Sequence, residues 1–393
     1  MAHYFSPDRG PDDPLDLLVA CAPGLEDLCA VECVEVLRSS ERLTVEPGGI
    51  ACEGGIEQVV LLNRFVGSAL HVLVRLDAFP CHHLRDFDKR VRRLAWDQLL
   101  QRGQPVAVKA TSKRSKLYHT GALEERVAKV LAEVTGVPES DREDPPEDES
   151  IPKIRVRVAA NHVTLSLDTS GSPLHRRGFR LQVGKAPLRE DFAWAMVRSS
   201  GWDPQEEVLL DPFCGSGSIP IHAALFAAGE PPNGVRRFAY ERTRWMGASP
   251  SRGDGGFEPV SDAFTVLGSD RDEGVVEAAR QNAGRATVGE QCSFERSTFS
   301  EGFERAFATG KPIRVVTNPP FGLRVSGRAR DDLAVLHQSF GELCRGSEQV
   351  RGGLILSADV GLTRRSGLAL EPALSVRAGG LPVTALRFGK SPR

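Results

Sequence analysis

The feature that most constrains the fold of this chain is an apolar strand that runs into a glycine-rich turn and then a helix. Val208 to Leu210 is the strand, Asp211 to Ser218 is the turn, with the sequence Asp-Pro-Phe-Cys-Gly-Ser-Gly-Ser, and Ile219 to Ala228 is the helix. Glycines at the start of a helix let a ligand approach the backbone closely. The stretch therefore predicts a ligand site where a buried strand ends.

The turn does not match the dinucleotide fingerprint G-x-G-x-x-G, because the third glycine would fall at Pro220. Its acid, Asp211, precedes the glycines. This order suits a nucleoside cofactor without a pyrophosphate, and a cationic cofactor gains from the carboxylate. A nucleotide-dependent oxidoreductase is correspondingly disfavoured.

A second strand, Phe264 to Gly268, ends in Ser269-Asp270-Arg271-Asp272. An acid at the end of a neighbouring strand is placed to hydrogen-bond a ribose diol. We therefore expect Asp270 to bind the sugar of the same cofactor.

A third apolar run, Ile313 to Val316, precedes Asn318-Pro319-Pro320-Phe321. The carboxamide oxygen of Asn318 and a backbone carbonyl of the Pro-Pro turn can both accept hydrogen bonds from one NH2 group, and the prolines hold that geometry. Phe321 can stack on the ring that carries the amine. The tetrad predicts a clamp for a flat amino-bearing group; the alternative is a plain turn that ends a strand, with the aromatic ring in the core.

These three elements together resemble the S-adenosylmethionine-dependent methyltransferases of the doubly wound, Rossmann-like type. In those enzymes an (Asn/Asp)-Pro-Pro-(Phe/Tyr) tetrad after the fourth strand marks methylation of amino nitrogens. The resemblance implies S-adenosylmethionine as cofactor, a catalytic tetrad of Asn318, Pro319, Pro320 and Phe321, and no metal. It implies a cofactor site made of Asp211, Phe213, Cys214, Gly215, Ser216, Gly217, Ser218, Asp270, Arg271, Ser297, Thr298 and Asn318. At Ser297 the family usually has an Asp that accepts from the adenine amine; a serine hydroxyl can accept that bond but carries no charge.

The formal net charge of −2 hides a local asymmetry. Lys89 to His119 holds nine Lys or Arg against one acid, and Lys153 to Arg189 holds eight against one. Between them, Glu139 to Glu149 holds seven acids. Basic segments that flank an acidic loop are the pattern expected of nucleic-acid binding, with a merely solvated surface as the alternative.

The basic front end also carries a resemblance. Val106 to Lys116, followed by His119-Thr120 and a helix, resembles the THUMP domain, an RNA-binding module. Leu174 to Arg180 with Ala186 to Glu190 is similar to the junction that follows this domain in THUMP-containing guanine-N2 RNA methyltransferases. That class I family has a large-subunit ribosomal RNA branch and a tRNA branch, which the residues do not separate. The resemblance implies a structured RNA partner, 23S ribosomal RNA first and tRNA next, with phosphate contacts by Lys109, Lys113, Arg114, Lys116, Arg176, Arg177 and Arg324.

The same resemblance divides the chain into four segments. Residues 14–80 form an α+β ferredoxin-like region, residues 81–170 the THUMP domain, residues 171–185 a linker and residues 186–393 the methyltransferase domain. Within the second segment we expect one amphipathic helix over Leu84 to Leu100, and a hairpin around Ala160-Asn161.

Other substrates stay open at this point. The Pro-Pro tetrad also serves adenine-N6 methyltransferases, and a similar tetrad serves enzymes that methylate a glutamine amide in protein, although the basic front end argues against a protein substrate. Guanine is preferred over adenine on the whole-chain resemblance alone. A non-catalytic RNA-binding assembly factor that keeps the fold is a further alternative.

Several classes are disfavoured by the sequence. No apolar run reaches the roughly 18 residues of a membrane span, and the first residues lack the pattern of a signal peptide, so we expect a cytoplasmic protein. Eight scattered cysteines without a C-x-x-C pair argue against a zinc ribbon and a disulfide framework. The triplet Cys81-His82-His83 has no partner cluster for a metal. The oligomeric state is not indicated.

Overall fold

The computed structural model describes residues 13–40, 43–137, 151–181, 188–244, 258–261, 263–320, 328–378 and 381–389. The chain divides into two compact units. The first contains Met1–Cys21, Cys29–Leu174 and Arg237–Gly255, and the second contains Ala22–Leu28, His175–Arg236 and Gly256–Arg393. Each unit has one sheet, and the two are described separately.

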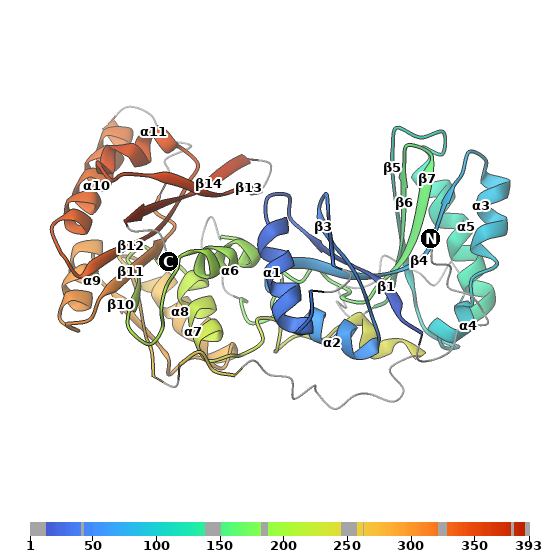
Figure 1. The fold of residues 1–393 in the computed structure, drawn as a ribbon, viewed down its shortest axis with the longest axis horizontal. Coiled ribbons are helices and arrows are strands. Elements are labelled where there is room, and N and C mark those ends of the chain that lie inside the picture. The colour runs from blue at the N-terminus through green and yellow to red at the C-terminus, as the bar shows by residue number, and fades with distance from the viewer. Residues whose placement is uncertain are drawn as a thin grey trace. The chain divides into compact units, whose positions relative to one another are not determined.

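The sheet of the first unit has the strand order β2-β3-β1-β4-β7-β6-β5 (Figure 1). Its strands are β1 (Leu15–Cys21), β2 (Thr44–Glu46), β3 (Gly49–Gly54), β4 (Ala69–Pro80), β5 (Ala107–Lys113), β6 (Lys153–Ala159) and β7 (His162–Asp168). The pair β5–β6 is parallel and the other pairs are antiparallel. Because β4 pairs with β7, one continuous sheet spans the boundary that the sequence predicted at residue 80.

The helices of this part are α1 (Glu26–Leu37), α2 (Ile56–Phe65), α3 (Leu84–Val91), α4 (Trp96–Leu99) and α5 (Thr120–Thr135). A later segment completes the unit: Phe238 and Tyr240, around the short helix η2 (Ala239–Arg242), belong to its hydrophobic core, with their rings stacked at 5.1 Å. The Tyr240 amide donates to the Thr169 carbonyl at 2.9 Å. The predicted methyltransferase segment 186–393 is thus interrupted by a stretch that returns to the first unit.

The single helix predicted over Leu84 to Leu100 is wrong. The structure has α3 and α4 with a turn between them, in which Ala95 leaves the helical conformation at φ −77°, ψ 63°. The Trp96 indole Nε1 donates to the Val91 carbonyl at 2.8 Å, and its ring is 2% exposed. Folding back to bury this ring and to satisfy a carbonyl at the end of α3 explains the break.

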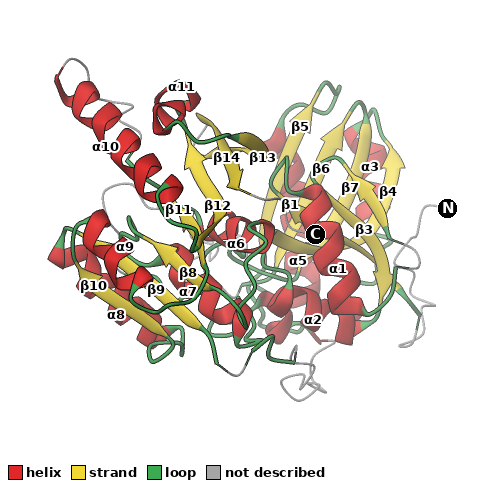
Figure 2. Cartoon of the chain, turned by 60° about the vertical axis from the view of Figure 1, so that its left-hand side comes forward, coloured by secondary structure: helices red, strands yellow, loops and turns green. Residues whose placement is uncertain are grey.

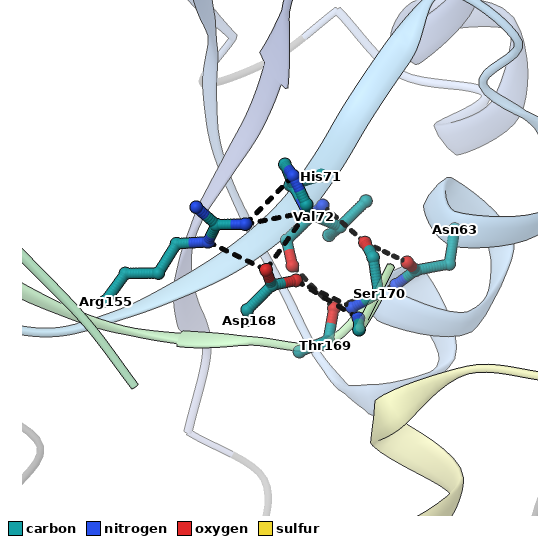
Figure 3. A network of polar contacts seen from close by, with 8 residues as sticks. Asn63, His71, Val72, Arg155, Asp168, Thr169 and Ser170 are labelled. Carbon is teal, nitrogen blue, oxygen red and sulfur yellow. Dashed lines mark hydrogen bonds and ion pairs between the residues drawn. The ribbon is translucent and has the colours of Figure 1, made fainter. Parts of the chain in front are cut away.

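A buried polar network fixes the end of β7 (Figure 3). The fully buried Asp168 accepts at Oδ2 from Arg155 Nε at 2.7 Å, and His71 Nδ1 lies 3.0 Å from the same oxygen. Its Oδ1 accepts from the Ser170 amide at 3.0 Å, and the Ser170 hydroxyl donates to Asn63 Oδ1 at 2.6 Å. Burial raises the pKa of Asp168, but the charges and hydrogen bonds of His71 and Arg155 outweigh that effect and lower it to about 2.

The second unit contains a doubly wound sheet, as predicted, with the strand order β10-β9-β8-β11-β12-β14-β13 (Figure 2). Its strands are β8 (Val208–Asp211), β9 (Thr265–Asp270), β10 (Cys292–Arg296), β11 (Ile313–Thr317), β12 (Val350–Ser357), β13 (Glu371–Ala378) and β14 (Leu381–Gly389). The first five in spatial order are parallel, and β14 is antiparallel to both of its neighbours.

Helices lie on both faces of this sheet, as parallel strands require. The helices of this unit are α6 (Glu190–Ser199), α7 (Ser218–Ala227), α8 (Glu273–Arg285), α9 (Phe299–Phe307), α10 (Arg328–Arg345), α11 (Val360–Thr363) and the short η4 (Arg364–Ser366). Of these, α9 and α10 lie on one side of the sheet, and α6, α7 and α8 lie on the other (Figure 1). The core under α9 and α10 joins Phe303 and Phe340 to Val208, Ile313 and Val315 of the strands. All eight cysteines are free and buried. In the described residues, no helix combines the length and apolar character needed to cross a membrane.

Candidate active site

The carboxyl ends of β8, β9 and β11 meet at one edge of the second sheet. The chain moves from β8 outward to β9 and β10, then returns to add β11 on the other side of β8. In an open parallel sheet, ligands bind outside the strand ends at such a reversal. Asp211 ends β8, Asp270 ends β9, and Asn318 directly follows β11. The topology therefore brings together the three motifs that the sequence singled out.

The glycine-rich turn has the backbone that its residues predict. Gly215 and Gly217 have φ of 52° and 87°, in the left-handed region that favours glycine. A Cβ at Gly217 would lie 3.0 Å from Ala279 Cβ and 3.1 Å from Phe294 Cζ, so this glycine permits packing. A Cβ at Gly215 would meet nothing within 4 Å. Gly215 thus presents its backbone to open space, where a ligand can approach.

Asp211 is a buried carboxylate whose described hydrogen-bond donors are neutral. Its Oδ1 accepts from Thr317 Oγ1 at 2.6 Å and from the Phe213 amide at 3.2 Å. Burial raises the pKa of Asp211 to about 7. The two hydrogen bonds act in the opposite direction and lower this pKa, whereas the negative charge of Asp270 raises it further. A cationic ligand group beside this carboxylate would relieve the cost of burying its charge.

Asp270 joins the end of β9 to the glycine-rich turn. Its Oδ2 accepts from the Gly215 amide at 3.1 Å, and its Oδ1 accepts from the Asp272 amide at 3.0 Å. The Cys214 amide donates to the Ser269 carbonyl at 2.9 Å, which fastens the turn to the same strand. Arg271, the next residue, is exposed. The carboxylate of Asp270 is therefore held at the open side of the turn.

Asn318 presents an unused acceptor at the end of β11. Its Oδ1 is buried and has no hydrogen-bond partner among the described residues. Pro319 is buried, Pro320 is exposed, and the buried His337 imidazole on α10 donates to the Pro320 carbonyl. A buried acceptor without a donor costs about 1–3 kcal/mol. An amine that donates to Asn318 Oδ1 would remove that cost. Phe321 and Arg324 lie outside the described residues.

Comparison with known proteins agrees with this geometry. Residues 177–361 match the family model described as the RMKL-like methyltransferase domain. This stretch contains the glycine-rich turn, both strand-end carboxylates and Asn318. The stretch that carries the candidate site is therefore similar to an RMKL-like methyltransferase domain.

Full-length relatives extend the similarity. A Synechocystis protein provisionally named an RNA methyltransferase, slr0064, is 27% identical over 93% of this chain and 94% of its own length. The ribosomal RNA large subunit methyltransferase K/L of Alcanivorax borkumensis is 35% identical over 58% of this chain and 33% of its own length. This chain spans a third to about half of the length of the K/L proteins it matches.

Among solved structures, SMU.472 is a provisionally assigned methyltransferase in complex with SAH. It superposes with a TM-score of 0.80 at 25% identity, covering 96% of this chain and 98% of that chain. The doubly wound methyltransferase fold predicted from the sequence is confirmed.

The remaining predicted cofactor residues of the methyltransferase domain have distinct environments. Phe213 packs against Phe299 at a centroid distance of 5.5 Å, and the Ser218 hydroxyl accepts from Arg180 at 3.0 Å. The Ser216 carbonyl accepts from the Asn282 amide group at 3.1 Å. These contacts hold the turn from three sides.

Ser297 and Thr298, which follow β10, make different kinds of contact. The Ser297 amide donates to the Asp270 carbonyl at 3.0 Å, which places Ser297 beside the end of β9. Thr298 is the N-cap of α9: its hydroxyl accepts from the Glu301 amide at 3.3 Å and donates to the Glu301 carboxylate at 2.8 Å. Since this capping box engages the hydroxyl, the geometry gives no support to a cofactor contact through the Thr298 side chain.

The structure corrects one predicted RNA contact. Arg177 is fully buried within the second unit, and its Nη1 donates to Asn233 Oδ1 at 2.5 Å. A guanidinium without exposed surface cannot reach a phosphate from solution. Arg176 beside it is exposed. Lys109, Lys113, Arg114 and Lys116 are exposed on β5 and the loop after it.

Two residues that contact the site were absent from the sequence prediction. Thr317 bonds Asp211 across the strand reversal, and His337 reaches the Pro-Pro turn from α10. Thr317 lies next to Asn318 in the sequence, but its hydroxyl partner is 106 residues away. Only the pairing of β11 with β8 reveals that bond.

Proposed function

We propose that this chain methylates the exocyclic N2 amine of a guanosine in structured RNA. The single observation that carries the proposal is the buried, unpaired Oδ1 of Asn318 at the strand reversal, beside a glycine-rich turn open to a ligand. The methyl donor is S-adenosylmethionine. When bound, this cofactor supplies an electrophilic methyl group on a sulfonium.

The residues of the turn fit such a donor. Asp211 provides a buried carboxylate for a cationic group, and Asp270 provides one for a ribose diol. The open backbone at Gly215 lets a nucleoside approach without a side-chain clash. The absence of a third glycine in the turn agrees with a ligand that has no pyrophosphate.

The tetrad supplies positioning. A guanine amine is a weak nucleophile because its lone pair is delocalised into the ring. Hydrogen bonds from that NH2 to Asn318 Oδ1 and the Pro319 carbonyl direct its lone pair towards the methyl group, so that the N–C bond forms as the S–C bond breaks. The amine loses its extra proton after transfer, and no strong general base is required. To reach the clamp the base leaves its helix, and Phe321 replaces the lost stacking.

The choice of RNA rests on the relatives and the exposed cations. Proteins named for methylation of large-subunit ribosomal RNA match nearly the whole chain at 28–29% identity. We propose large-subunit ribosomal RNA as the first candidate and tRNA as the second. Lys109, Lys113, Arg114 and Lys116 on the first unit would contact phosphates. We propose that the protein meets its RNA in the cytoplasm.

An adenine-N6 amine is the second candidate, because the same clamp accepts any flat amine. The test is incubation of the purified protein with methyl-labelled S-adenosylmethionine and total RNA from cells that lack the gene. The expected product is N2-methylguanosine in large ribosomal RNA. Labelled N6-methyladenosine would keep the clamp and overturn the base. Absence of label, with cofactor and RNA both bound, would overturn the activity and favour an assembly role.

A further inference from the structure

One aromatic side chain of the first unit is unusually exposed. Tyr118, in the loop between β5 and α5, has 67% of its surface accessible. Among the described residues, no other Phe, Tyr or Trp is exposed to a comparable extent. Its ring lies 4.1 Å from the His119 ring, at an angle of 40°. Most aromatic side chains bury their large apolar surface in a core or an interface. An exposed ring is therefore a candidate contact for a binding partner.

The loop that carries Tyr118 is held rigidly. The Lys113 carbonyl accepts from the Ala160 amide at 3.1 Å and from the Ser115 hydroxyl at 2.9 Å. That hydroxyl accepts from the Asn161 amide at 3.0 Å, and Asn161 Oδ1 accepts from the Lys116 amide at 2.7 Å. These bonds tie the loop to the β6–β7 turn. The exposed ring is therefore presented in a fixed place before any ligand arrives.

The surroundings of the ring are cationic. Lys113, Arg114 and Lys116 are exposed, and none of them forms an ion pair with a described residue. Leu117, between the last cation and the ring, is buried and anchors the loop in the core. A ring among unpaired cations suits a polyanion with flat apolar groups better than a protein partner, which would require a broader apolar patch.

We propose that Tyr118 stacks on one unpaired base of RNA while Lys113, Arg114 and Lys116 hold the adjacent phosphates. This proposal extends the RNA-binding role proposed above and depends on it. The ring offers a π-face to any base, so the contact selects unpaired nucleotides without selecting sequence. A double helix keeps its bases stacked inside and offers the loop only its phosphates.

The test compares the full chain with Tyr118→Ala and Tyr118→Phe for binding to a labelled single-stranded oligoribonucleotide and to a blunt duplex of the same sequence. We expect Tyr118→Ala to weaken single-strand binding about 5- to 150-fold, the usual range for loss of one base stack. Tyr118→Phe should bind like the wild type. Duplex binding and the dependence of single-strand binding on salt should not change.

Lys113→Ala combined with Arg114→Ala is the matched control for phosphate contacts. It should lower the single-strand salt slope by about 1.4, at roughly 0.7 for each phosphate contact. Equal single-strand affinity in Tyr118→Ala and wild type would overturn the proposal, as would an equal loss on the duplex. Methyl transfer is assayed in parallel, so that the two proposals can fail separately. If the protein labels RNA but Tyr118→Ala binds the single strand as tightly as the wild type, the stacking proposal alone is refuted. If Tyr118→Ala weakens single-strand binding but no RNA is labelled, the methylation proposal alone is refuted.

Discussion

Asp168 in the first unit and Asp211 in the second are both almost completely buried, with exposed fractions of 0% and 1%. Asp168 lies against the His71 imidazole and the Arg155 guanidinium, and its pKa is lowered to about 2. Asp211 has only neutral donors among its described hydrogen-bond partners, and burial raises its pKa to about 7. The two carboxylates are buried to the same extent, so the opposite directions of their pKa shifts come from their different partners.

The difference separates a structural carboxylate from a ligand-binding one. A buried charge whose partners come from the chain itself has nothing left to bind, and removing it harms the fold. A buried charge that lacks a cation costs stability until a ligand supplies one. The unpaired Oδ1 of Asn318 is the uncharged parallel: a buried acceptor that lacks a donor until a ligand supplies one. Function in this protein is therefore expected where the fold leaves polar groups unsatisfied.

Asp168→Asn should have the largest effect. It leaves Arg155 without its counter-charge and His71 without its carboxylate partner. We expect it to destabilise the first unit by about 2–4 kcal/mol, below the usual range for a fully buried pair because Arg155 is partly exposed. Hydrogen exchange should quicken in β4 and β7 and stay unchanged in β8 and β11. Equal protection in the mutant and the wild type would show that the network does not stabilise the unit.

The same residue predicts a dependence on pH. The pKa of Asp168 is lower in the folded state than in the unfolded state, so its contribution is present above the unfolded value of about 4. That contribution is lost as the pH falls through about 2. Acid should therefore narrow the stability difference between wild type and Asp168→Asn, as measured by urea unfolding between pH 5 and about 2.

Asp211→Asn should show the opposite pattern. It removes a carboxylate that the fold does not neutralise, so stability at pH 8 should be equal to or higher than that of the wild type. Affinity for S-adenosylmethionine should fall about 10- to 100-fold, as expected for loss of one charged hydrogen bond. Calorimetric titration and thermal unfolding of the same samples test both statements. If Asp211→Asn instead lost much stability and kept its affinity for the cofactor, Asp211 would be a structural carboxylate like Asp168.

Thr317→Val should have the smallest effect, because it removes one neutral donor of Asp211 and leaves the carboxylate in place. Loss of the 2.6 Å hydrogen bond should raise the pKa of Asp211 further. A cationic cofactor binds the ionised carboxylate, so affinity strengthens as the pH rises through the pKa and levels off above it. In Thr317→Val, the pH at which the cofactor affinity stops rising should increase by about one unit or less. In Thr317→Ser this pH should return to the wild-type value. An unchanged pH profile of the dissociation constant would argue against the coupling.

The local motifs were predictable because each lies within a few adjacent residues. The glycine-rich turn, Asp270 and the Asn-Pro-Pro tetrad each follow a strand whose apolar run is legible in the sequence. The parallel sheet then brings the strand ends together. That much of the site follows from local pattern and fold class.

Contacts between distant segments were not predictable. Arg177 is buried, and the acceptor of its hydrogen bond, Asn233, lies 56 residues later in the sequence. The breaking of the predicted Leu84–Leu100 helix depends on the indole of Trp96 turning inward. His71 and Asp168 carry no motif, and they meet only because β4 pairs with β7. From charge and periodicity alone, such residues are predicted to lie on the surface or within a helix. Their actual environment depends on partners that are distant in the sequence.

The most direct test of the central claim is the rate of RNA methylation by Asn318→Ala, with Asn318→Asp as the control that keeps an oxygen acceptor. Both variants are compared with the wild type at saturating S-adenosylmethionine and RNA. We expect Asn318→Ala to lower the methylation rate about 100-fold or more, because the amine is no longer positioned. RNA and cofactor affinities should stay near those of the wild type, and Asn318→Asp should retain part of the rate. A wild-type rate in Asn318→Ala, or a rate loss explained by weaker binding, would contradict the positioning role of Asn318.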